Sequence, residues 1–298
     1  MVKYLKTAFF IILYTFIYLF FMLLCQIVLG LTIGGAGRGL VEFLTPGAPV
    51  DQAHVNDAAN IASRRINEYV TQNTGLIFSI SALLSLLVYI KIFSARKLNL
   101  FSLLHMDRRP FGADIRYGAF AGASANFVIS LIVVLLQSFG LFTEAFSRHE
   151  AHMEATFGTG GVLATLLGVG IIIPLIEEIM FRGMIVYELG RSAPWKAVII
   201  IQGVIFGIYH LVPVQIFYTI PLGIYFGYIV YKTGSIWPAA AGHIAMNSVS
   251  ILLVSSNIME TSDASAFSFI YMILSAYMFI SALIYFIKKK PSAAGEGG

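Results

Sequence analysis

Four polar side chains inside apolar segments could together activate a water molecule and stabilise an oxyanion: Glu177, His210, His243 and Asn247. A carboxylate and an imidazole can activate a water as nucleophile, and a second imidazole and an amide can donate hydrogen bonds to the oxyanion. Charged groups within membrane segments are costly and usually line a cavity or a reaction site. The function should therefore be sought where these four side chains meet.

Two further charged residues lie in the same segment as Glu177. Glu178 and Arg182 share one helix face because they are four residues apart, whereas the side chain of Glu177 points about 100° away. Glu178 and Arg182 are therefore predicted to form a structural ion pair that leaves the Glu177 carboxylate free. The competing interpretation makes both glutamates helix-end charges near the lipid headgroups. It suits Glu177 less well, because the span needs this stretch inside the bilayer to reach full length.

The composition places these residues in an integral membrane protein. The chain has 298 residues, of which 58% are hydrophobic and 11% are charged, against about 25% charged in soluble domains. The net charge of +4 comes from residues in loops between apolar segments, so no nucleic-acid partner is expected. The single cysteine, Cys25, lies in the first apolar segment, which excludes a disulfide framework.

Eight apolar segments are candidate membrane spans, because about 20 such residues cross the hydrocarbon core. They cover residues 7–33, 75–95, 113–140, 159–181, 196–210, 213–231, 236–256 and 266–287. The predicted fold class is all-α, a polytopic membrane helix bundle that forms a single membrane domain over residues 1–290. Pro213 separates the short fifth segment from the sixth, so these two are expected to form a hairpin that does not reach the far surface.

Lys and Arg concentrate in every second loop, which predicts the cytoplasmic side of the membrane. Because basic residues also precede the first span and follow the eighth, both termini are expected in the cytoplasm. The first outer loop, residues 34–74, is predicted to be extracytoplasmic, with an interfacial helix over residues 51–73. The polar tail, residues 291–298, is predicted to be disordered.

Three motifs follow one another along the second half of the chain. They are Glu177-Glu178-x-x-x-Arg182, Phe206-x-x-x-His210 and His243-x-x-x-Asn247. Together they resemble the three motifs of the CAAX protease and bacteriocin-processing (CPBP, or Abi) family of intramembrane endopeptidases, which includes the type II CAAX prenyl endopeptidases. The likeness covers residues 165–255, the expected catalytic core, and no motif position departs from the family pattern. Residues 1–150 carry no motif.

This resemblance implies an intramembrane endopeptidase that hydrolyses a peptide bond in a protein or peptide substrate. Glu177 would be the general base, and His210 would help to hold and activate the water. His243 and Asn247 would donate hydrogen bonds to the oxyanion, while Glu178 and Arg182 would orient the helix. No cofactor is implied, the lipid bilayer is the partner around the spans, and a bacterial plasma membrane is the expected location.

Other functions stay open at this point. A zinc-dependent intramembrane metalloprotease would use Glu177, His210 and His243 as ligands with a water in the fourth position, although the chain has no His-Glu-x-x-His spacing. A non-proteolytic membrane regulator or bacteriocin self-immunity protein would use the glutamates only to stabilise helix packing. A transporter would be supported by an internal inverted repeat, which the sequence does not show.

Overall fold

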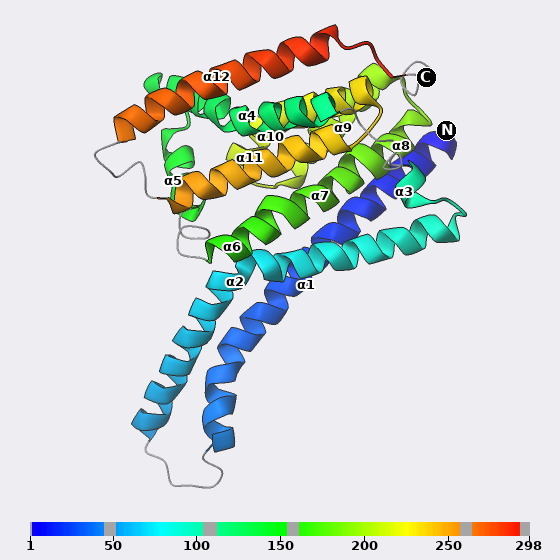
Figure 1. Cartoon of the computed structure of the whole chain (residues 1–298). Helices are drawn as coiled ribbons and strands as arrows, with labels where there is room; N and C mark the ends of the chain where they lie inside the picture. Colours follow the sequence, from blue (N-terminus) through cyan, green and yellow to red (C-terminus); the bar gives the residue numbers. More distant parts are fainter. Residues whose placement is uncertain (1, 45–51, 104–111, 154–160, 257–263, 293–298) are drawn as a thin grey trace.

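The computed structural model describes residues 2–44, 52–103, 112–153, 161–256 and 264–292. These residues form a bundle of α-helices without a β-strand (Figure 1). Seven helices in this part of the chain are long and apolar enough to cross a membrane, and α9 is a shorter apolar helix. The predicted fold class, an all-α polytopic membrane bundle, is confirmed, and the short fifth span corresponds to α9.

The helices in chain order are α1 (Val2–Leu44), α2 (Gln52–Ala95), α3 (Leu100–Leu103), α4 (Gly112–Ser138), α5 (Thr143–Met153), α6 (Val162–Thr165), η2 (Leu166–Ile172), α7 (Ile173–Glu178), η3 (Ile179–Ile185), α8 (Val186–Gly190), α9 (Trp195–Tyr209), α10 (Pro213–Thr233), α11 (Trp237–Ser255) and α12 (Ala264–Lys288).

One continuous helix, Val162–Gly190, passes through the middle of the bundle and carries both glutamates. It consists of α6, η2, α7, η3 and α8, of which η2 and η3 have π-helical hydrogen bonding. Such π-helical turns inside α-helices are frequent at functional sites. The apolar pattern predicts that this span ends at residue 181, whereas the helix continues to Gly190.

This central helix is covered on two sides (Figure 1). On one side α1 and α2 pack against each other and against the central helix, and on the other side α11 does so, backed by α4 and α12. Every residue from Ile176 to Ile185 is buried as a result. The stretch around the glutamates is therefore shielded by protein on all faces, which is the setting that membrane-embedded charges require.

Two close helix contacts fix the elements that carry the histidines. A Cβ atom added to Gly122 on α4 would lie 1.7 Å from the carbonyl oxygen of Gly242, the residue before His243. Likewise, a Cβ atom on Gly223 of α10 would lie 2.9 Å from the Cα atom of Gly203 on α9. Small residues let helix backbones approach this closely in membranes, so α11 and α9 are each held against a neighbour beside the site.

Both ends of the described chain lie at one end of the bundle (Figure 1). There the hydroxyls of Thr7 and Ser192 are 2.9 Å apart, and Lys232 donates a hydrogen bond to the carbonyl of Lys289. This is the arrangement that an even number of membrane crossings produces. Most of the loops predicted to be cytoplasmic from their Lys and Arg content contribute residues to this end.

At the opposite end α1 and α2 extend beyond the other helices as a helical hairpin (Figure 1). The segment predicted as an outer loop, residues 34–74, is helical over 34–44 and over 52–74. The interfacial helix expected over residues 51–73 is the first half of α2. From residue 293 onward, the tail predicted to be disordered lies outside the described residues.

Candidate active site

Of the two neighbouring glutamates, Glu178 forms short hydrogen bonds to a guanidinium and to an imidazole. Its Oε1 atom accepts hydrogen bonds from Arg182 Nη1 at 2.7 Å and from His243 Nδ1 at 2.9 Å. The side chains of Glu178 and Arg182 are fully buried. The ion pair that the four-residue spacing predicts is therefore present, and it holds a third group, the imidazole of His243.

Arg182 is enclosed by aromatic rings as well as by its carboxylate partner. Its guanidinium carbon lies 4.2 Å from the ring centroid of Phe206 and 5.7 Å from that of Phe226. Contacts of this kind are attractive, and more so when the cation is desolvated. A buried ion pair is costly to desolvate, and removal of one partner is strongly destabilising. Loss of either Arg182 or Glu178 would therefore leave the other charge buried without its partner.

Glu177, the residue before Glu178, has only long contacts among the described residues. Its Oε1 accepts a hydrogen bond from the Tyr209 hydroxyl at 3.5 Å, and its Oε2 lies 3.7 Å from His243 Nε2. Normal hydrogen bonds between such atoms are shorter, at about 2.7–3.2 Å. The residue is nevertheless buried, with 6% of its surface exposed. Glu177 is therefore an enclosed carboxylate that no close donor saturates.

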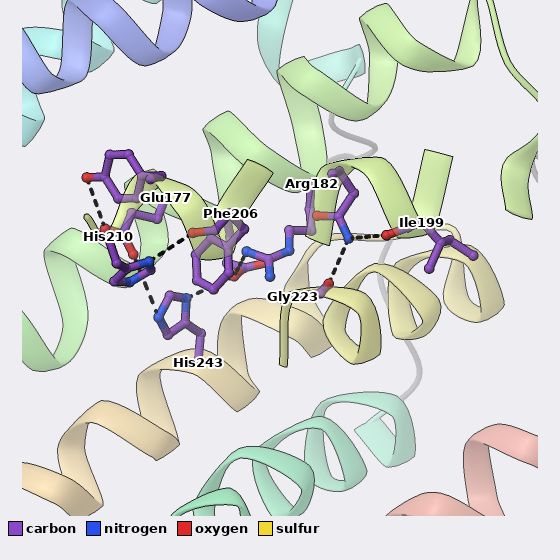
Figure 2. Close-up of polar contacts among 10 residues, drawn as sticks. Glu177, Arg182, Ile199, Phe206, His210, Gly223 and His243 are labelled. Atoms are coloured by element: carbon purple, nitrogen blue, oxygen red, sulfur yellow. Dashed lines mark hydrogen bonds and ion pairs between the residues drawn. The ribbon is translucent and has the colours of Figure 1, made fainter. Parts of the chain in front are cut away.

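His243 contacts both glutamates, and Figure 2 shows its ring below Glu177 and Phe206. Its Nδ1 atom bonds to Glu178 and its Nε2 atom faces Glu177. A carboxylate that accepts from Nδ1 fixes the tautomer and the orientation of the ring. Glu178 therefore sets the direction in which His243 Nε2 points.

His210 follows the last residue of α9, where the chain turns sharply into α10. Leu211 has a φ angle of 60°, and Pro213 occupies the first turn of α10. The turn lets His210 Nδ1 fold back onto the carbonyl of Phe206 at 2.8 Å. Since a carbonyl can only accept, Nδ1 carries a proton, and in the neutral imidazole Nε2 then keeps its lone pair. Figure 2 shows the His210 ring on the same side of Phe206 as Glu177.

Phe206 is the common neighbour of these groups. Its ring centroid lies 4.9 Å from that of His210 and 5.6 Å from that of His243, both with nearly perpendicular planes. Arg182 stacks on the same ring. The motif phenylalanine thus spaces two imidazoles and a guanidinium around one aromatic wall, a role that its place in the sequence did not reveal.

Asn247 faces the backbone of the central helix rather than the glutamates. Its Nδ2 donates a hydrogen bond to the carbonyl of Val169 at 3.0 Å. In the π-helical stretch η2 the N–H of Ile173 bonds to Gly168, so it does not serve Val169 in the usual α-helical way. The next residue, Pro174, has no N–H at all. Asn247 therefore supplies the donor that the central helix lacks at Val169.

The structure thus places Arg182, His210 and His243 around Phe206. Both glutamates contact His243, and Asn247 lies one helical turn after His243 on α11. Sequence reasoning missed two tyrosines near this site: Tyr209, whose hydroxyl contacts Glu177, and Tyr18, whose ring packs against that of Tyr209. Tyr209 could have been noticed because it precedes His210. Tyr18 gives no such signal, since an aromatic residue in a first membrane span is ordinary.

In the described part of the chain, no three His, Cys, Asp or Glu side chains are arranged to hold a metal ion. This applies also to the set considered for zinc from the sequence, Glu177, His210 and His243. The donor types suit zinc, and Nε2 of the neutral His210 ring would have a lone pair for it. His243 Nδ1 is hydrogen-bonded to Glu178, so this imidazole could bind a metal only through Nε2.

Two buried carboxylates and a buried imidazole therefore lie inside a polytopic helix bundle. Residues 159–249 match the family model of the type II CAAX prenyl endopeptidases, Rce1-like, and this range contains all three motifs. The chain is therefore related to the CAAX protease (CPBP) family over these residues, as the motifs predicted, and it is an integral multi-pass membrane protein. No curated protein and no solved structure matched the chain.

Proposed function

We propose that the chain hydrolyses a peptide bond of a protein or peptide substrate with a water molecule activated by Glu177. The observation that carries this proposal is the unequal treatment of the two neighbouring glutamates. Glu178 binds a permanent cation at 2.7 Å, whereas Glu177 is almost as deeply buried and has contacts of only 3.5 and 3.7 Å. A general base must be enclosed and yet free to take a proton, and Glu177 meets both conditions.

His210 is suited to hold the water. Its Nδ1–H is committed to the Phe206 carbonyl, so Nε2 can accept a hydrogen bond from the water while Glu177 takes a proton from it. Two acceptors on one water leave an oxygen lone pair directed at the substrate carbonyl. This geometry increases the nucleophilicity of the water without a covalent intermediate.

His243 and Asn247 are suited to stabilise the oxyanion. The Glu177, Glu178 and Arg182 side chains sum to one negative charge when both carboxylates are ionised, so an imidazolium at His243 would neutralise the cluster. In that state Nε2–H donates to the oxyanion while Nδ1–H stays on Glu178. Asn247 has two amide N–H donors; the Val169 carbonyl takes one and thereby orients the other.

The proposed reaction needs no cofactor, since the chain itself provides the base and the oxyanion donors. The substrate is a peptide segment that enters the bundle from the bilayer or from its surface. The family relationship favours a substrate cut near a chain end. A bacterial plasma membrane is the proposed location.

Comparative peptidomics tests the proposal. Cells that carry the wild-type chain should contain new peptide termini that are missing from cells with Glu177→Gln, at equal protein levels. Glu144→Gln provides a matched control, because Glu144 is an exposed glutamate whose ion pair among the described residues is with Arg148 on α5. Identical peptide termini in all three strains would contradict the proposal and favour a non-proteolytic regulator. The identified peptide then serves as the substrate for kinetics with purified protein.

A further inference from the structure

The carboxylate of Glu177 has one hydroxyl donor among the described residues, Tyr209. This tyrosine is the last residue of α9 and directly precedes His210. Its ring packs edge-on against Phe181 of the central helix at a centroid distance of 5.2 Å. The hydroxyl therefore reaches Glu177 from a ring that is fixed by packing.

A second tyrosine, Tyr18, stands behind Tyr209. It belongs to α1, far outside the residues that match the family model. Tyr18 is fully buried, and its ring meets that of Tyr209 edge-on at 5.5 Å. The buried Tyr18 hydroxyl has no hydrogen-bond partner among the described residues, and the ring contact places Tyr18 directly beside Tyr209.

The order of donation in this pair follows from what each group can do. A hydroxyl has one proton to donate and two lone pairs that accept. The ionised Glu177 carboxylate can only accept, so Tyr209 donates to it, and the Tyr209 oxygen keeps its lone pairs as acceptors for the Tyr18 hydroxyl beside it. A donor whose own oxygen accepts a hydrogen bond is polarised, and the chain of bonds is strengthened. A buried hydroxyl without any partner is destabilising, so the alternative of an idle Tyr18 hydroxyl is unfavourable.

We propose that Tyr209 and Tyr18 are positioning residues for Glu177, and that α1 thereby completes an active site whose motifs all lie in the second half of the chain. Tyr209 holds Oε1 of Glu177, so that Oε2, on the His243 side, is presented to the water. Tyr18 acts through Tyr209 and does not touch the reacting atoms. This inference rests on the proposed function of Glu177 as the base.

The rival explanation is that the two tyrosines serve only as bulky rings in the core. Substitution by phenylalanine separates the two, because it keeps the ring and removes the hydroxyl. Tyr271→Phe is the matched control, since the Tyr271 hydroxyl is also buried without a hydrogen-bond partner among the described residues but lies on α12, which packs on α4.

The test measures kcat and KM on the peptide found by peptidomics. Tyr209→Phe should lower kcat about tenfold, with KM and Tm close to wild type, because only a hydrogen bond to the base is lost. Tyr18→Phe should lower kcat about threefold, and the double variant should be no slower than Tyr209→Phe alone, since residues that act through one another are not additive. Tyr271→Phe should equal wild type.

The outcomes separate this inference from the function on which it rests. An unchanged kcat in Tyr209→Phe, with an active wild type and an inactive Glu177→Gln, would overturn the inference alone. A Tyr18→Phe effect that multiplies with that of Tyr209→Phe would refute the serial arrangement. Infrared difference spectra add a readout that needs no substrate: the carboxylate band assigned with Glu177→Gln should shift in Tyr209→Phe, and an unshifted band would also overturn the inference.

Discussion

Two carboxylates about three helical turns apart on the central helix are almost equally buried and yet differently surrounded. Glu188 accepts from Tyr14 at 3.1 Å, forms an ion pair with Arg96, and has Arg191 at 3.4 Å. Glu177 has a tyrosine at 3.5 Å and an imidazole at 3.7 Å. Burial alone therefore does not distinguish a structural carboxylate from a reactive one; the number and closeness of the donors do.

The partners of Glu188 show what a structural carboxylate achieves. Arg96 follows the last residue of α2, Tyr14 belongs to α1, and Glu188 is in α8. The ring of Tyr14 also packs against Phe93, and its carbonyl accepts from Tyr89. One buried charge thus joins three helices at the end of the bundle where both termini lie. No such saturation exists at Glu177, where additional donors would compete with proton transfer.

The largest expected effect separates these two carboxylates directly. Glu177→Gln should lower kcat by about 10²–10⁴-fold, the range for loss of a general base, with an unchanged Tm. Glu188→Gln should keep kcat within about threefold and lower Tm, because a neutral amide pairs poorly with Arg96 and costs about 1–3 kcal/mol. Peptide cleavage and thermal unfolding of the two purified variants check this. The comparison fails if the effects are exchanged.

The second prediction compares the two arginines that neutralise carboxylates on this helix. Arg182→Ala should destabilise the protein by about 3–5 kcal/mol, because it leaves Glu178 charged in a site without solvent. Arg96→Ala should cost much less, since the Arg96 side chain is partly exposed and Arg191 remains near Glu188. Protein level in membranes and Tm in detergent give the order. Equal losses would show that the depth of the Glu178 pair has no energetic consequence.

The depth of the site explains which parts could be predicted from the sequence. Apolar runs and the charges within them are local features, so the spans and the motif residues were visible. With the central span ending at residue 181, Glu177 would lie near the membrane surface, well above His210. The helix continues to Gly190, which places Glu177 about 13 residues, or roughly 20 Å, from its end. His210 is about 15 residues from Trp195, roughly 22 Å, so the two depths agree.

The sequence did not predict the last part of this helix, residues 182–190, because the charge of Glu188 is neutralised by a residue that is remote in sequence. Glu188 and Arg191 resemble loop charges, yet Glu188 is 1% exposed because Arg96 neutralises it from another helix. His243 presents the same difficulty: its bond to Glu178 joins residues 65 positions apart. Spacing within one helix predicts the Glu178–Arg182 pair, but it carries no information on these contacts between helices.

A smaller effect is expected at Asn247, where structure and chemistry can be separated. Asn247→Ala removes the donor to Val169 together with the proposed oxyanion donor, so kcat should fall about 10²-fold and stability by about 1–2 kcal/mol. Pro174→Ala returns an N–H to the π-helical stretch, where it can bond to the Val169 carbonyl. In that background Asn247→Ala should lose activity but little stability. Double-mutant cycles for Tm and for kcat check this; equal stability losses in both backgrounds would mean that Asn247 does not replace the missing N–H.

The last prediction expects no effect at all and puts the contrast between Glu177 and Glu188 at greatest risk. If zinc were bound by Glu177, His210 and His243, Glu177 would be a metal ligand and not an unsaturated base. Purified protein should contain well under one zinc per chain by elemental analysis, with the same content in Glu177→Gln. Dialysis against a chelator should leave kcat unchanged, because the base, the water-holding imidazole and the oxyanion donors all belong to the chain.

A stoichiometric zinc that is lost in Glu177→Gln, with activity that returns only on zinc addition, would replace the proposed mechanism by Lewis-acid catalysis. Since His243 Nδ1 is bonded to Glu178 at 2.9 Å, that ion would have to use Nε2 and shorten the 3.7 Å gap to Glu177. Metal occupancy and the Glu177–His243 distance are therefore expected to change together or not at all.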